Sequence, residues 1–116
     1  MLRGMARAYV ALGSNLGRRQ LALRAAVARL GMVAGTRVVA VARFRETMPV
    51  NAPEGSGKFI NSAAVVETTL EPGELLARLL EIERELGRER VDGERNVARV
   101  IDLDLLMYEE IGRAHV

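Results

Sequence analysis

Residues 59–87 read FINSAAVVETTLEPGELLARLLEIERELG, and within this stretch the spacing of apolar side chains changes from alternation to helical periodicity. Over residues 59–69 the alternation is that of a strand, with Phe59 and Asn61 pointing to the same face. From Pro72 to Gly87 the apolar residues recur about every 3.6 positions, as on one face of a helix; they are Leu75, Leu79, Ile82 and Leu86. The stretch therefore predicts a strand followed by an amphipathic helix.

Working outward, the flanking segments predict one further helix and three further strands. The expected elements are a strand over Tyr9–Leu12, a helix over Leu16–Gly31, a strand over Thr36–Thr47 and a last strand over Val100–Tyr108. Residues 48–58 and 88–98 are polar or rich in glycine and proline and predict loops. The order βαββαβ predicts an α+β fold, a ferredoxin-like sandwich in which a four-stranded antiparallel sheet carries two helices on one face.

Composition narrows the class of protein. A chain of 116 residues predicts a single domain, residues 1–116. No stretch reaches the roughly 18 apolar residues of a membrane helix, and the run AYVALG is shorter than the core of a signal peptide, so we expect a soluble cytoplasmic protein with no membrane partner. The sequence has no cysteine, and any catalysis must use oxygen and nitrogen groups.

Residues 99–106, RVIDLDLL, place two carboxylates in an otherwise apolar strand. Alternation puts Asp102 and Asp104 on one face, where oxygen ligands this close suit Mg²⁺ together with substrate phosphates. The alternative is a solvated sheet face. The basic residues just ahead of the pair favour a polyphosphate site, although interspersed acids also allow a self-neutralising loop; these basic residues are Arg88, Arg90, Arg95 and Arg99.

The run RNVARVIDLDLL at 95–106 resembles the signature of the 6-hydroxymethyl-7,8-dihydropterin pyrophosphokinase family. The resemblance continues in order through YVALGSNLG (9–17), FRETMPV (44–50), FINSAAVVET (59–68) and LLEIERELGRER (79–90). It implies an enzyme of folate biosynthesis that transfers pyrophosphate from ATP to 6-hydroxymethyl-7,8-dihydropterin and releases AMP. ATP and the pterin are then the partners, with no nucleic acid among them.

The resemblance also implies roles for individual residues. Asp102 and Asp104 would hold two Mg²⁺ ions, and Arg88, Arg90 and Arg99 would act on the phosphates during catalysis. The nucleotide site it implies consists of Leu76, Arg88, Arg90, Arg95, Arg99 and Leu105. The pterin site it implies consists of Asn15, Thr47, Val50, Phe59, Asn61 and Glu83. Plainer roles stay open for several of these: a core position for Phe59, a turn for Thr47, a helix N-cap for Asn15 and a solvated surface position for Glu83.

The sequence departs from the family pattern in two places. Asn96, Val97 and Ala98 stand where the family usually has an aromatic residue, glycine and proline. The family's segment beyond the D-x-D strand, which closes over ATP and the pterin, has no counterpart, and His115 is not assigned its histidine's role. Three hypotheses follow: an active enzyme whose missing wall is dispensable or supplied by the second subunit of a homodimer; a truncated or degenerate member that binds nucleotide; or a ferredoxin-like ligand- or RNA-binding module.

Overall fold

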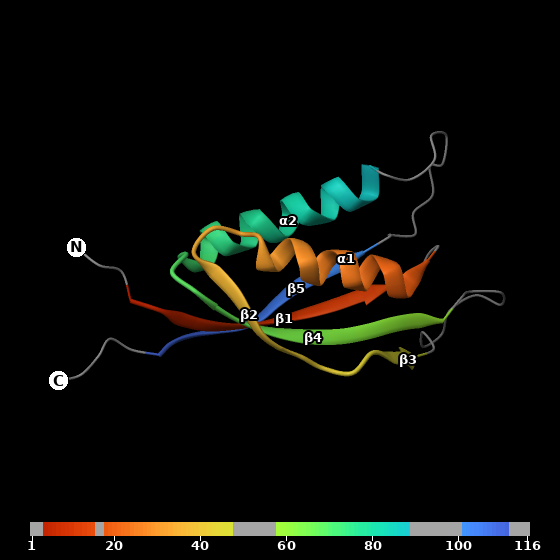
Figure 1. Ribbon diagram of the computed structural model, residues 1–116, viewed down its shortest axis with the longest axis horizontal. Helices are drawn as coiled ribbons and strands as arrows, with labels where there is room; N and C mark the ends of the chain where they lie inside the picture. The colour runs from red at the N-terminus through yellow and green to blue at the C-terminus, as the bar shows by residue number, and fades with distance from the viewer. Residues whose placement is uncertain (1–3, 16–17, 48–57, 89–100, 112–116) are drawn as a thin grey trace.

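The computed structural model describes residues 4–15, 18–47, 58–88 and 101–111, with the side chain of Arg88 excepted. Its elements, in chain order, are β1 (Ala6–Ser14), α1 (Arg19–Gly31), β2 (Thr36–Val41), β3 (Arg45–Thr47), β4 (Phe59–Thr68), α2 (Pro72–Arg88) and β5 (Asp102–Glu110). Both helices lie on the same side of the sheet (Figure 1). No helix among these residues is long and apolar enough to cross a membrane.

The sheet has the order β2-β4-β1-β5, with β3 paired to the same strand, β4, as β2. All of these pairs are antiparallel. Strand β4 lies between β1 and β2, and β1 lies between β4 and β5, so each helix connects two strands that are not neighbours. This split β-α-β arrangement confirms the α+β, ferredoxin-like prediction.

The strand predicted over residues 36–47 is two strands, β2 and β3, which makes the sheet five-stranded and not four-stranded. The register against β4 shifts between Val38 and Ala40, so the edge strand carries an extra residue there. Such a bulge bends a strand. The chain leaves regular pairing at residues 42–44, where Phe44 packs against the core, and pairing resumes at Arg45.

The core lies between the sheet and the two helices. Alternate residues of β1 are buried, from Ala6 to Ser14, and their neighbours on the other face are only half-buried. The four apolar residues predicted for one face of the second helix are all buried, which confirms that prediction; they are Leu75, Leu79, Ile82 and Leu86. The opposite face of the sheet, which we call the open face, carries no helix among the described residues (Figure 1).

A polar contact inside the core joins β2 to β4 and leads into α2. The hydroxyls of Thr36 and Thr68 lie 2.7 Å apart, and the Leu70 N–H donates to Thr68 Oγ1 at 3.0 Å. Helix α2 then begins at Pro72, with the Glu71 N–H donating to Glu74 Oε1 at 2.8 Å. This is half of a capping box, and it satisfies a donor that the first helical turn leaves without a partner.

Candidate active site

The two aspartates of β5 project from the open face. Asp102 and Asp104 are exposed, whereas Leu103 between them and Ile101 before them are buried against the helices. The strand alternation expected from RVIDLDLL is confirmed, and both carboxylates point away from the core.

Gly13 of β1 lies between the aspartates and the strand that carries Asn61. It is directly opposite Asp102 on one side and Asn61 on the other. A Cβ atom at Gly13 would come within 3.0 Å of Asn61 Oδ1. The absence of a side chain therefore leaves room for the Asn61 carboxamide over β1, on the same face as the carboxylates. The sequence suggested only that Gly13 ends an apolar run, whereas in the structure β1 continues through Gly13 to Ser14.

Three of the residues assigned to the pterin come together on the open face. Thr47 of β3 is directly opposite Phe59 of β4, and Asn61 Nδ2 donates to Thr47 Oγ1 at 2.6 Å. Thr47 lies in a strand, so its alternative role as a turn residue is wrong. Phe59 is half-buried, and the core side of β4 is occupied by Ile60, so Phe59 is not a core residue either.

Glu83 connects α2 to β5. Its Oε2 atom accepts a hydrogen bond of 2.7 Å from the N–H of Leu103, the residue between the two aspartates. The side chain is half-buried. The plainer role of a solvated surface glutamate is therefore wrong, because the carboxylate holds a backbone group of the strand that carries the acidic pair.

Asn15 directly follows β1 and is half-buried. It is not the N-cap of the first helix, because α1 begins at Arg19 and its N-cap is Arg18, which makes no side-chain capping bond. The predicted start at Leu16 was too early, because the helical spacing of Leu23 and Leu30 does not show where the first turn begins.

Leu76 and Leu105, assigned to the nucleotide, belong to the neighbouring elements α2 and β5. Leu76 is exposed, while Leu105 is half-buried against the core. The other residues of the predicted phosphate and pterin sites fall outside the described residues: Val50, Arg90, Arg95, Arg99 and the side chain of Arg88.

The donor set fits a hard divalent cation. Asp102 and Asp104 provide carboxylate oxygens on one exposed face, and Mg²⁺ commonly takes one or two protein carboxylates and completes its shell with water and substrate phosphates. Among the described residues no group of three or more acidic or histidine side chains could form a complete protein cage. The pair is therefore suited to a metal shared with a phosphate ligand.

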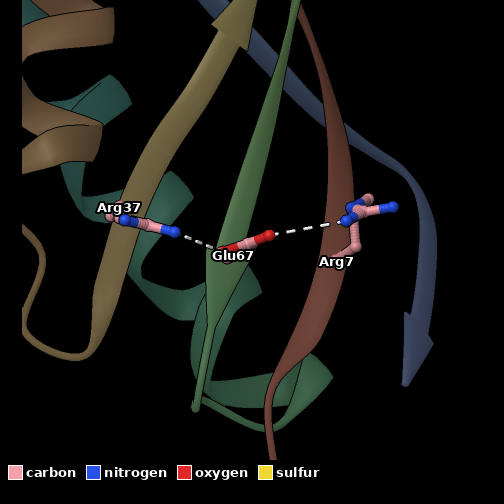
Figure 2. Close-up of polar contacts among 3 residues, drawn as sticks. All are labelled: Arg7, Arg37 and Glu67. Carbon is pink, nitrogen blue, oxygen red and sulfur yellow. Dashed lines mark hydrogen bonds and ion pairs between the residues drawn. The ribbon is translucent and has the colours of Figure 1, made fainter. Parts of the chain in front are cut away.

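A second polar cluster lies on the open face at the other end of the strands. Glu67 of β4 accepts hydrogen bonds from Arg37 of β2 at 2.8 Å and from Arg7 of β1 at 3.4 Å (Figure 2). The hydrogen bond from Arg37 is the largest cause that lowers the pKa of Glu67. Arg7 and Gly13 are six residues apart on β1, about 20 Å at 3.3 Å per residue, so this cluster is separate from the aspartate site.

Comparison with known proteins shows the family of the chain. Residues 9–116 match the family model for 7,8-dihydro-6-hydroxymethylpterin-pyrophosphokinase (HPPK). The chain belongs to this family. It is 45% identical over 101 residues to the 2-amino-4-hydroxy-6-hydroxymethyldihydropteridine pyrophosphokinase of Bacillus subtilis. The matched region covers 87% of the chain and 59% of the relative.

Other relatives give a similar match. The Haemophilus influenzae protein of the same name is 38% identical over 104 residues, covering 90% of the chain and 63% of the relative. The mitochondrial folate synthesis bifunctional protein of Pisum sativum is 40% identical over 99 residues, covering 85% of the chain and 18% of that protein. The chain thus spans about three fifths of the length of the bacterial HPPK relatives.

Proposed function

We propose that the chain carries the pyrophosphoryl-transfer site of an HPPK enzyme, with MgATP and 6-hydroxymethyl-7,8-dihydropterin as substrates. The observation that supports this most directly is the row Asp102–Gly13–Asn61 on the open face, with Asn61 bonded to Thr47. The carboxylate pair suited to a metal therefore lies on the same side of three adjoining strands as the polar surface around Asn61, which Phe59 borders. Such a surface can hold a polyphosphate and a flat heterocycle side by side.

In the proposed reaction the hydroxymethyl oxygen of the pterin attacks the β-phosphorus of ATP. A new O–Pβ bond forms, the bond from Pβ to the α,β-bridging oxygen breaks, AMP leaves with that oxygen, and the hydroxyl proton passes to solvent. Transfers of this kind depend mainly on positioning and on electrostatic stabilisation of the phosphates.

The residues of the chain supply that positioning. Phe59 offers an aromatic surface to the pterin ring, and the Asn61 carboxamide can present both a donor and an acceptor to the ring edge. Asp102 and Asp104 would hold magnesium, with two ions expected from the family. Bound magnesium would supply positive charge at the triphosphate and lower the pKa of a coordinated hydroxyl. We assign phosphate binding to Arg88, Arg90, Arg95 and Arg99.

Two alternative functions compete with this proposal, namely nucleotide binding without turnover and RNA binding. A nucleotide-binding protein without turnover would use the same carboxylates, so only an activity assay distinguishes it from the enzyme. An RNA-binding sheet is less well supported, because such sheets stack bases on neighbouring aromatic side chains. Among the described strands, the open face carries Tyr9 and Phe59, whereas Tyr108 donates its hydroxyl to the Leu70 carbonyl on the helix side.

The deciding experiment measures AMP release from MgATP with and without 6-hydroxymethyl-7,8-dihydropterin at fixed salt. Pterin-dependent AMP formation supports the proposal. Asp102→Asn and Asp104→Asn should each abolish it while leaving the fold intact, because both side chains are exposed and fill no core volume. Full magnesium-dependent activity in either variant would refute the metal assignment. A folded protein that binds an ATP analogue with Mg²⁺ and forms no AMP would support the non-catalytic alternative.

A further inference from the structure

We propose that Glu83 is a positioning residue, which fixes the backbone of β5 between Asp102 and Asp104 and thereby sets the direction of both carboxylates. This inference rests on the proposed function, and it departs from the substrate contact expected for Glu83 from the family resemblance. Its basis is the 2.7 Å hydrogen bond from the Leu103 N–H to Glu83 Oε2.

The location of β5 explains why this bond matters. Among the described residues β5 pairs with β1 alone, so it is an edge strand. The N–H groups on the outer side of an edge strand have no strand partner. Leu103 directs its N–H to Glu83, while its neighbours Asp102 and Asp104 are paired in register with Gly13 and Ala11 of β1. The strand is therefore held from both sides at the position of the acidic pair.

The part of α2 that carries Glu83 is packed against the core. Glu83 follows Ile82 on α2, and Leu79, Ile82 and Leu86 are buried in the core. The Leu103 side chain is 4% exposed and belongs to the same core cluster. Helix and strand thus pack together through Leu103, and the hydrogen bond from its N–H to Glu83 removes the remaining freedom of the strand to rotate its backbone. Because Asp102 and Asp104 flank Leu103, any rotation there would turn both carboxylates.

This positioning role requires a hydrogen-bond acceptor and does not require a negative charge. Glutamine keeps a side-chain oxygen that can accept from the Leu103 N–H, whereas alanine leaves that N–H without its partner. A residue that bound magnesium or removed a proton would lose its function in both variants. Comparing Glu83→Gln with Glu83→Ala therefore separates a positioning residue from a group that acts on substrate or metal.

The first measurement is the activity of the two variants as a function of Mg²⁺ concentration. We expect Glu83→Gln to stay within about threefold of the parent protein, and Glu83→Ala to need at least tenfold more Mg²⁺ for half-maximal AMP formation. The matched control is Glu81→Ala, which removes from the same helix an acid paired with Arg78 at 3.3 Å and should leave the Mg²⁺ dependence unchanged. Equal loss in Glu83→Gln and Glu83→Ala would overturn the proposal, as would parent-like Mg²⁺ dependence in Glu83→Ala.

The second measurement does not depend on activity. Amide hydrogen exchange at Leu103 should be slow in the parent and in Glu83→Gln and at least tenfold faster in Glu83→Ala, while exchange at Leu12 of β1 stays unchanged. If the parent forms no AMP, the proposed function fails and the exchange result still tests the contact. Unchanged exchange at Leu103 in Glu83→Ala, or a general rise across β1 as well, would overturn the local positioning role.

Discussion

Replacing Gly13 by alanine should damage pterin binding while leaving stability nearly unchanged. The added Cβ would lie 3.0 Å from Asn61 Oδ1, about 0.4 Å inside the 3.4 Å at which ordinary contact begins. The Asn61 carboxamide ends a flexible side chain and can move aside. Its movement would break or lengthen the 2.6 Å hydrogen bond to Thr47 and withdraw the amide from the open face.

The expected change in the free energy of unfolding is small, whereas the expected change in pterin binding is large enough to measure. Gly13 is not among the described glycines with a positive φ, so alanine can adopt its backbone conformation. The reduced freedom of the unfolded chain then contributes about 0.4–1 kcal/mol of stability, comparable to the cost of the displaced side chain. A misplaced amide loses hydrogen bonds to the ring worth about 0.5–1.5 kcal/mol each. We therefore expect the pterin KM to rise about tenfold with a net stability change below about 1 kcal/mol.

The assay is a titration of pterin at saturating MgATP, together with thermal unfolding of the same preparations. Gly73→Ala is the matched control, because a Cβ at that position of α2 meets nothing within 4 Å. Its pterin KM should equal that of the parent. An unchanged pterin KM in Gly13→Ala would refute the reasoning, because it would mean that the position of the Asn61 carboxamide does not affect substrate binding.

Two further predictions concern the fold. Thr68→Val should destabilise the protein by about 1–3 kcal/mol in urea unfolding. The reason is that the Leu70 N–H and the Thr36 hydroxyl lose their bonded partner in the core. A smaller loss of stability would show that these two groups find other partners. The lowered pKa of Glu67 means that its interactions with Arg37 and Arg7 stabilise the fold above the pKa of the unfolded chain, and that this contribution is lost as pH falls through the folded-state pKa. The urea midpoint of Glu67→Gln should accordingly lie below that of the parent at pH 7 and converge with it on acidification, and a constant difference down to pH 3 would contradict the assignment.

Local periodicity was enough to predict most of the fold. The buried face of α2 follows from the spacing of Leu75, Leu79, Ile82 and Leu86. The common face of Asp102 and Asp104 follows from strand alternation, and both patterns depend only on neighbours along the chain. The division of the predicted second strand into β2 and β3 could not be read in this way. It depends on a register shift against β4, a strand that lies later in the sequence.

The same distinction between local pattern and tertiary contact applies to the candidate site. The sequence by itself determined the types of group available, a carboxylate pair, an aromatic and an amide, and which of them share one face of their strand. Only the tertiary structure decided that Gly13 separates Asp102 from Asn61, that Asn61 is bonded to Thr47, and that Glu83 holds the N–H of Leu103. These are contacts across strands or between helix and strand. Their geometry is set by strand order, register and the packing of α2 on β5, which no local pattern encodes.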